Sequence, residues 1–195
     1  MELIEPNFTR VSDILQIFQA YAHVPIEKLR KAQELGTDIH SAIENFFNGK
    51  FTTLQEKKMS VFLSFLEWAN HNNVKPILQE SRFYDQGLKI TGRIDLLAKV
   101  NDVITLVDFK TGSWAHPEIW RLQGTFYRHL IQHTNFTKDA DLPIPDRFLF
   151  IQLQKDGSFP RLFEFFYDSY DWNICVSAIK LYYYFKEASL QKIHC

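Results

Sequence analysis

Hydrophobic residues in the first third of the chain recur at the three- and four-residue spacing of amphipathic helices. The pattern predicts a helix over residues 13–20 with Ser12 as its N-cap, and a further helical segment that Thr37 could cap. A third helix is expected over about 54–71. The expected apolar faces are Ile39, Ile43, Phe46 and Phe47 on the second helix, and Met59, Phe62, Leu63, Leu66 and Ala69 on the third. Residues 1–72 are therefore expected to be mainly helical.

From Ile77 onward the pattern changes to short β-rich runs. Asp85-Gln86-Gly87 and Asn101-Asp102 are turn signals between these runs, so they predict a meander of strands. Pro117 suits the first position of a helix that extends to about residue 133.

Two further strands, near 148–154 and 161–166, flank Asp156-Gly157, and a long helix is expected from about Asp171. The order of elements is helices, sheet, helix, hairpin, helix. It predicts one α/β domain over residues 1–195, with a central mixed β-sheet, carried by residues 77–167, flanked by helices.

The turn at Asn101-Asp102 has the chemistry of a two-residue hairpin loop, which fixes the register of the strands on either side. Counting back from the loop places Asp95 directly opposite Asp108 on one face of the sheet, with Cβ atoms about 4.5–5.5 Å apart. Lys110 shares that face because side chains alternate along a strand. We therefore expect the three groups to converge.

Two carboxylates in one small space repel each other unless a cation lies between them. Mg²⁺ and Mn²⁺ prefer oxygen ligands and are commonly held by one or two carboxylates. Such an ion can activate water and neutralise charge on a phosphate, while Lys110 could orient or deprotonate the water or stabilise developing charge. The spacing is equally compatible with Asp95 and Asp108 facing solvent at strand ends, with Lys110 as their ion-pair partner.

Four segments resemble the motifs of the PD-(D/E)XK nucleases, in their RecB-like branch. Gly92-Arg93-Ile94-Asp95 and Val107-Asp108-Phe109-Lys110-Thr111-Gly112 resemble its G-x-(I/V)-D and D-(F/Y)-K-T motifs. Gly36-Thr37-Asp38-Ile39-His40-Ser41-Ala42-Ile43-Glu44 is similar to its G-x-x-x-H-x-x-x-E helix, and Gln123-Gly124-Thr125-Phe126-Tyr127 to its Q-x-x-x-Y helix. The helical start of the chain also resembles that of the small phage and mitochondrial genome maintenance exonucleases.

The resemblance implies a metal site and a set of catalytic residues. His40, Asp95, Asp108 and the backbone carbonyl of Phe109 would bind Mg²⁺ or Mn²⁺, and Asp95, Asp108 and Lys110 would be catalytic. The four cysteines that hold an iron-sulfur cluster in several relatives are absent, and no Walker-type loop is present, so neither a cluster nor a nucleotide cofactor is expected.

The resemblance also implies supporting residues. Glu44, Glu80, Gln123 and Tyr127 would support the site or position the substrate, with Glu80 ranked lowest because its spacing from the next motif is loose. Taken without the other motifs, His40 reads as a buried histidine beside an exposed Glu44, and Gln123 and Tyr127 read as helix surface.

Aromatic side chains near the expected centre could stack on unpaired bases. The candidates are Trp114 and His116, in the loop after Lys110, and Trp120, although most aromatic residues in the chain are expected to be core. Small basic clusters that could follow a backbone, or simply form solvated helix faces, are Lys28, Arg30, Lys31, Lys57 and Lys58. The run Tyr182-Tyr183-Tyr184-Phe185 is expected to serve helix packing.

The composition narrows the class of protein. A hydrophobic fraction of 46% with 23% charged residues is ordinary for a soluble globular domain, and no run is long enough for a membrane span. The net charge of -1 argues against a broad basic surface, so contacts with nucleic acid are expected to be local. The first residues lack the features of a signal peptide, which makes a cytoplasmic location the expectation.

The sequence therefore predicts a metal-dependent DNA exonuclease that hydrolyses phosphodiester bonds of single-stranded or end-exposed DNA. Repair, recombination or phage replication would be its setting, with repair or recombination proteins as partners. Two alternatives stay open: a structure-selective or restriction-type endonuclease, and a non-catalytic nucleic-acid-binding module that keeps the nuclease fold.

Overall fold

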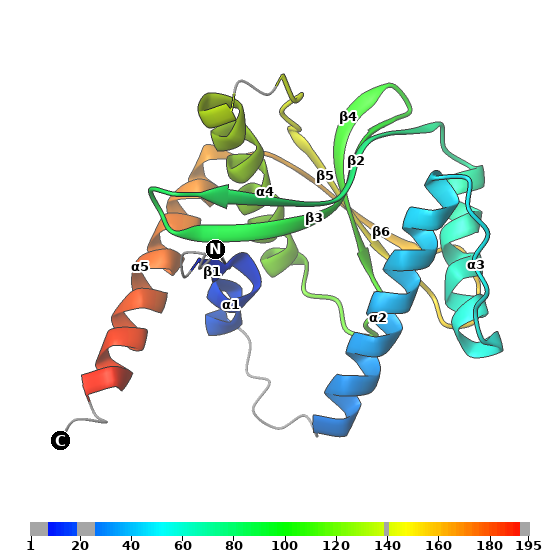
Figure 1. Ribbon diagram of the computed structural model, residues 1–195, viewed down its shortest axis with the longest axis horizontal. Coiled ribbons are helices and arrows are strands. Elements are labelled where there is room, and N and C mark those ends of the chain that lie inside the picture. Colours follow the sequence, from blue (N-terminus) through cyan, green and yellow to red (C-terminus); the bar gives the residue numbers. More distant parts are fainter. Residues whose placement is uncertain (1–7, 19–25, 139–140, 192–195) are drawn as a thin grey trace, which may run out of the picture.

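A computed structural model describes residues 8–18, 26–138 and 141–191. Its elements in chain order are β1 (Thr9–Arg10), α1 (Val11–Leu15), the 3-10 turn η1 (Gln16–Phe18), α2 (Ile26–Phe47), α3 (Glu56–Asn70), β2 (Val74–Asp85), β3 (Ile90–Val100), β4 (Val103–Lys110), α4 (Pro117–Lys138), β5 (Arg147–Gln152), β6 (Arg161–Phe166) and α5 (Ser169–Gln191). The strands within these ranges form one six-stranded sheet (Figure 1).

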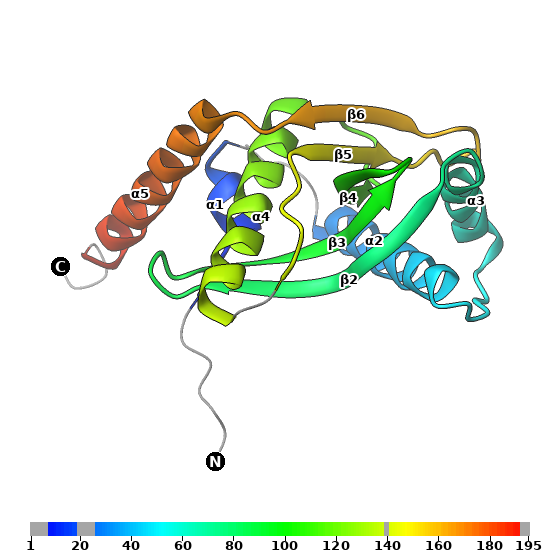
Figure 2. The same ribbon diagram turned by 90° about the horizontal axis from the view of Figure 1, so that it is seen from above.

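The sheet lies between two layers of helices (Figures 1 and 2). Its order is β1-β3-β4-β5-β6, and β2 pairs with the other edge of β3. The pairs β1–β3 and β4–β5 are parallel, whereas the others are antiparallel. One buried cluster joins the sheet to α1, α4 and α5, and a second joins its other face to α2 and α3. The expected α/β domain with a mixed central sheet flanked by helices is confirmed.

The predicted N-caps of the first two helices are wrong. Helix α1 starts at Val11, so Ser12 lies inside it and caps nothing. Helix α2 passes through Thr37, because packing of its apolar face against α3 and the sheet outweighs the local capping preference of one threonine. The predicted helix over 13–20 corresponds to α1 and η1, and residues 19 and 20 lie outside the described ranges.

Helix α3 matches its predicted range closely, but its buried face is rotated from the predicted one. Phe65 and Trp68 are fully buried, whereas Leu63, which was expected inside, is 46% exposed. Both buried rings pack edge-on against Phe109 of β4, at 5.5 and 6.0 Å between centroids. Contact with the strand that carries the candidate site therefore sets the orientation of this helix.

The hairpin between β3 and β4 has the predicted register. Asn101 and Asp102 both have positive φ, 50° and 67°, as a two-residue hairpin loop with right-handed twist requires. Pairing runs from Val100 opposite Val103 to Leu96 opposite Val107. The turn at Asn101-Asp102 is confirmed.

The ladder ends one step before the predicted pair of Asp95 and Asp108. The Asp95 carboxylate accepts the backbone N–H of Phe109 at 2.8 Å, and β4 continues beside β5 as far as Lys110 opposite Gln152. Because β1 pairs with β3 only at Ile90-Thr91, this edge of β3 has no strand partner from 92 to 95 among the described residues. The sheet is therefore split where the predicted catalytic residues lie.

Two glycines allow α4 to pack unusually close to the sheet at this split. A Cβ on Gly92 of β3 would lie 2.7 Å from Cε1 of Tyr127, and one on Gly124 of α4 would lie 2.5 Å from Cδ2 of Phe148. Any larger residue at either position would force the helix and sheet apart. The glycines thus determine how near the polar side chains of α4 come to β4.

The turn after β2 anchors the long β2–β3 hairpin to α4. Asp85 is buried, accepts the N–H groups of Gly87 and Leu88, and accepts a hydrogen bond from Nε2 of His129 at 2.7 Å. The His129 ring stacks on Trp172 of α5 at 4.0 Å. One carboxylate therefore joins the hairpin to two helices.

The remaining elements follow the prediction with small shifts in their ends. Pro117 begins α4, which continues to Lys138, beyond the predicted end, and β6 has the predicted limits. In the aromatic run of α5, Tyr182 and Tyr183 pack against the core, whereas Tyr184 and Phe185 are exposed. None of the described helices has the length and hydrophobicity needed to span a lipid bilayer.

Replacing Gly124 tests the close packing of α4. We expect Gly124→Ala to lower the free energy of unfolding by about 1–2 kcal/mol, because overpacking against Phe148 outweighs the gain in helix propensity. Gly36→Ala is the matched control, since this glycine also lies inside a helix but its Cβ would make an ordinary contact of 3.6 Å. Chemical denaturation should show stabilisation for Gly36→Ala; destabilisation of both variants alike would contradict the packing argument.

Acidification tests the anchor at Asp85. Burial alone would raise the pKa of Asp85, but its hydrogen bonds with Leu88 and His129 outweigh that effect and hold the pKa below 3.8. The carboxylate therefore stabilises the fold above that pH, and the contribution is lost as the pH falls through the lowered pKa. At pH 7, Asp85→Ala should cost about 1–3 kcal/mol in denaturant titrations. Its difference from the wild type should narrow below pH 3.8, and a gap that stays constant would refute the anchor.

Candidate active site

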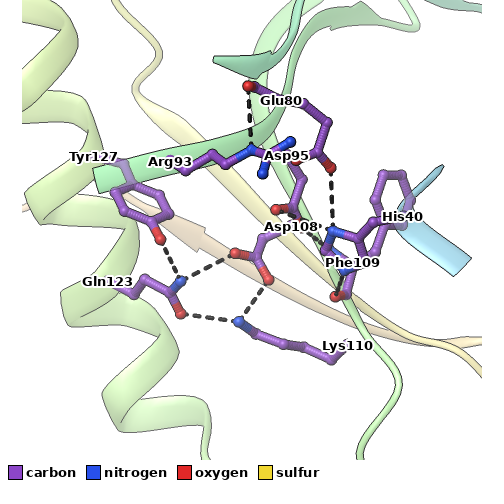
Figure 3. Close-up of polar contacts among 9 residues, drawn as sticks. All are labelled: His40, Glu80, Arg93, Asp95, Asp108, Phe109, Lys110, Gln123 and Tyr127. Atoms are coloured by element: carbon purple, nitrogen blue, oxygen red, sulfur yellow. Dashed lines mark hydrogen bonds and ion pairs between the residues drawn. The ribbon is translucent and has the colours of Figure 1, made fainter. Parts of the chain in front are cut away.

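The first part of the candidate site joins the end of β4 to α4. Nζ of Lys110 lies 2.6 Å from Oδ1 of Asp108 and donates to Oε1 of Gln123 at 2.9 Å (Figure 3). The amide Nε2 of Gln123 donates to Oδ2 of Asp108 at 3.1 Å and to the hydroxyl of Tyr127 at 2.8 Å. These contacts agree with the expectation that Asp108 and Lys110 share a face of the sheet, and they place Gln123 and Tyr127 on one face of α4.

The second part joins β2, β3 and α2. Nδ1 of His40 lies 3.2 Å from Oε1 of Glu80 and 3.4 Å from Oδ1 of Asp95, and its Nε2 lies 3.0 Å from the backbone oxygen of Phe109 (Figure 3). His40, Glu80 and Asp95 each offer a ligand atom, and these atoms lie within 4.8 Å of one another. Glu80, which the sequence ranked lower because of its loose spacing, is thus one of the three residues whose candidate ligand atoms lie close together.

The expected same-face pairing of Asp95 and Asp108 needs correction. Asp108 takes its partners from the α4 side of the sheet, whereas Asp95 contacts His40 of α2, on the other side. The split between β3 and β4 still lets the two carboxylates approach, because the charge of Asp95 contributes to the raised pKa of Asp108. The pair meets across the split and not on one face.

The two carboxyl groups and His40 have strongly perturbed acidities. Burial, together with the charge on Asp95, raises the pKa of Asp108 to about 6, against the opposing effect of Lys110. For Asp95 the effect of burial is outweighed by His40 and Lys110, so its pKa is lowered. Burial opposes the charge on His40, but Asp95 and Glu80 raise its pKa to about 11. The raised pKa favours the protonated form of His40, which lies between the carboxylates of Glu80 and Asp95.

Tyr127 contributes a protonated hydroxyl to the same network. Burial and the charges of Asp108 and Asp95 raise its pKa far above the ordinary value for tyrosine. The neutral hydroxyl accepts from Gln123 and so helps to fix the orientation of that amide. The amide oxygen then faces Lys110.

A cavity of about 360 Å³ opens over the His40 group. Its lining residues are Gly36, Thr37, His40, Ser41, Glu44, Glu80, Arg93 and Asp95. Glu44 lines this cavity, one turn after His40, but lies outside the compact group of three ligand atoms. Arg93, to which the sequence analysis gave no role, pairs with Glu80 at 2.7 Å. The sequence signal that could have indicated a role for Arg93 is its position two residues before Asp95.

A second cavity, of about 320 Å³, opens beside Lys110 and Gln123. Trp114 and His116 line it, and the Trp114 side chain is 83% exposed. Trp120 also lines this cavity, but it is only 6% exposed and its ring stacks on Phe150, so the predicted contact of Trp120 with DNA gains no support from its position.

The predicted basic clusters form local ion pairs on helices. Arg30 pairs with Glu34 one turn later at 3.1 Å, and Lys58 pairs with Asp38 of the neighbouring helix. These contacts agree with the solvated-face interpretation of the clusters.

The donor set of the site fits a hard divalent cation. It offers carboxylate oxygens, one imidazole and a backbone carbonyl, the kind of donors that Mg²⁺ and Mn²⁺ accept. Oδ1 of Asp108 is buried and its recorded partner is Nζ of Lys110 at 2.6 Å, so a second lone pair on this oxygen stays available to a cation. Thiolate ligands are absent from the described site.

Comparison with known proteins identifies the family. The family model described as the PD-(D/E)XK nuclease superfamily matches residues 49–171, more than half of the chain. The chain therefore belongs to the PD-(D/E)XK nuclease superfamily, as the motifs indicated, and its class is that of a nuclease. No curated protein is significantly similar to the sequence.

A solved structure from Eubacterium rectale shares the fold at low sequence identity. A protein from Eubacterium rectale, described as a candidate exonuclease, is 11% identical with a TM-score of 0.51, and the match covers 90% of this chain and 78% of that one. The protein SSO0001 is 15% identical with a TM-score of 0.44, at coverages of 92% and 78%. LHK-Exo in complex with dAMP is 11% identical with a TM-score of 0.40, at 96% and 91%.

Metal titration distinguishes the two glutamates of the cavity. Glu80→Gln should weaken Mn²⁺ binding about tenfold or more in isothermal titration calorimetry, because it removes a charged donor from the compact group. Glu44→Gln, the matched control on the same cavity, should leave the affinity within about twofold. If both variants lost the same Mn²⁺ affinity, the overall negative charge of the cavity would bind the ion and Glu80 would have no particular role.

Proposed function

We propose that the protein is a divalent-metal-dependent DNA exonuclease that acts on single-stranded DNA or on exposed DNA ends. The observation that carries the proposal is the convergence of two motif groups, His40 with Glu80 and Asp95, and Asp108 with Lys110, at the split in the sheet. Membership of the nuclease superfamily supports phosphodiester hydrolysis. Cleavage from ends follows the resemblance to RecB-like exonucleases and agrees with the description of the Eubacterium rectale protein.

Mg²⁺ or Mn²⁺ would be held by Asp95, Asp108, His40 and the carbonyl of Phe109, with Glu80 as a further donor. A bound ion of this kind supplies a Lewis acid and lowers the pKa of water. The carboxylates of Glu80, Asp95 and Asp108, from β2, β3 and β4, concentrate negative charge around the site, which favours a divalent over a monovalent cation.

Lys110 would act on the attacking water or on the charge that develops at the phosphate. Its ammonium group is held by Asp108 and Gln123 and lies above the Phe150 ring at 5.3 Å from the centroid. Gln123 is a positioning residue, because Tyr127 and Asp108 fix its amide so that the oxygen faces Lys110. A fixed lysine needs little rearrangement when charge develops.

Trp114 would stack on an unpaired base of the substrate strand. It is exposed at the mouth of the cavity beside Lys110, so a base placed there would follow directly from a phosphate at the metal centre. Stacking on an aromatic face tolerates any base. This contact favours a single-stranded substrate.

Replacing Asp108 tests the proposed chemistry. Asp108→Asn should reduce hydrolysis of end-labelled single-stranded DNA by a factor on the order of 10³ or more, since metal-ion catalysis contributes several kcal/mol. Asp102→Asn is the matched control, because this exposed aspartate lies at the turn of the same hairpin and asparagine tolerates its positive φ. Thermal unfolding should confirm that both variants are folded.

Substrate topology and metal removal separate the alternatives. Linear single-stranded DNA should be degraded from its ends with Mg²⁺ or Mn²⁺, whereas covalently closed circles should remain intact. Cutting of the circle would favour the endonuclease, and inertness towards every form would favour the binding module. Hydrolysis that persists in EDTA would eliminate the metal-dependent mechanism.

A further inference from the structure

Two arginines lie directly opposite each other on the β2–β3 hairpin. Arg82 of β2 pairs in register with Arg93 of β3, and both are exposed. Their neighbours Phe83 and Ile94 are buried in the core on the α4 side of the sheet. Because side chains alternate along a strand, Arg82 and Arg93 project from the opposite face, away from α4.

This arginine pair lies next to the acidic centre. Arg93 lines the cavity that contains His40, Glu80 and Asp95, and its Nε contacts Glu80 at 2.7 Å (Figure 3). Its other recorded contact, with the Glu80 backbone oxygen at 3.2 Å, also uses Nε. Among the described residues, no hydrogen bond of its two terminal nitrogens is recorded, and its side chain is 53% exposed.

The fold itself gives no reason for Arg82. Like charges directly opposite each other destabilise a strand pair. Glu80 balances Arg93, but the described part of the chain contains no hydrogen bond or ion pair of the Arg82 side chain. The same hairpin holds a second pair of opposed cations, Lys75 and Lys99, and there Asp102 lies near both, at 4.0 and 3.7 Å.

The chemistry of the site requires a positive contact of this kind. A strand of DNA must bring phosphates towards three carboxylates in a protein whose net charge is -1. The terminal nitrogens of a guanidinium group match two phosphate oxygens in geometry and charge. Two exposed guanidinium groups at the edge of the acidic cavity offset its repulsion of a polyanion.

We propose that Arg82 and Arg93 together bind the phosphodiester backbone of the substrate strand, on the side of the metal centre away from Trp114. The inference rests on the proposed nuclease function and deepens it, because it gives the strand a path. The path runs from the arginine pair, past the carboxylates, to the cavity beside Lys110. The contact is with phosphates and therefore carries no sequence preference.

Salt dependence of binding tests the arginine pair. The probe is fluorescein-labelled single-stranded DNA, titrated by fluorescence anisotropy in Mg²⁺ with Asp108→Asn proteins to prevent hydrolysis. The slope of log K against log [salt] is negative, and each phosphate contact on a single strand contributes about 0.7 to its magnitude. Adding Arg82→Gln should therefore lower that magnitude by about 0.7, and adding both Arg82→Gln and Arg93→Gln should lower it by about 1.4. Affinity at low salt should fall in the same order.

The matched control is Lys75→Gln/Lys99→Gln, which removes two opposed cations from the same hairpin far from the acidic centre. Its slope should remain that of the parent protein. If the arginine and lysine variants change the slope equally, the positive charge acts only through the overall field and the proposed site is refuted.

Hydrolysis of a small phosphodiester substrate tests the arginine site separately from the proposed nuclease function. With Asp108 intact, Arg82→Gln should raise the KM for long single-stranded DNA more than the KM for bis(p-nitrophenyl) phosphate, which contains one phosphate and no strand. Equal kinetics of Arg82→Gln and wild type on long DNA would overturn only the arginine site. A wild-type protein that neither binds nor cleaves DNA would overturn the proposed function, and the arginine site with it.

Discussion

The hydrogen bond from the Phe109 N–H to the Asp95 carboxylate determines where the sheet splits. A buried backbone N–H must find an acceptor, and a side-chain oxygen here replaces the cross-strand pairing that ends at Leu96 and Val107. Beyond this point β4 follows β5 and leaves β3 behind. The same carboxylate therefore ends the ladder, opens the space for the site and offers a ligand within it.

Close packing of α4 supplies the other half of the site. Glycines at 92 and 124 remove the two Cβ atoms that would separate helix from sheet, so Gln123 comes within hydrogen-bonding distance of both Asp108 and Lys110. Two glycines of the sequence motifs thus serve packing, and the packing determines the position of a polar group. The motifs that contain Gly92 and Gly124 therefore set the distance between helix and sheet in addition to supplying polar side chains.

The turn at Asn101-Asp102 could be predicted because its geometry is local, and it fixed five pairs of the ladder correctly. The side-chain directions beyond it could not be predicted. Ile94 and Leu96 lie in different buried clusters, so β3 changes face between them. Both faces of the sheet are buried, and the run Ile94-Asp95-Leu96-Leu97 therefore has no alternation of polar and apolar residues that could reveal this change. The burial of Trp120 and the place of Glu80, whose φ is 45°, likewise depend on distant neighbours.

The charges of the site form three pairs, and this arrangement explains how a nearly neutral chain keeps three carboxylates together. Glu80 faces Arg93, Asp95 faces His40, and Asp108 faces Lys110. Each cation comes from a different element, β3, α2 or β4, so the balance exists only in the folded chain. The imidazole of His40 would have to lose its proton before His40 could serve as a ligand of a divalent ion, whereas Arg93 and Lys110 line two cavities beside the centre. A phosphate placed between those cavities would therefore meet a cation on either side, and these two cations would offset part of its negative charge.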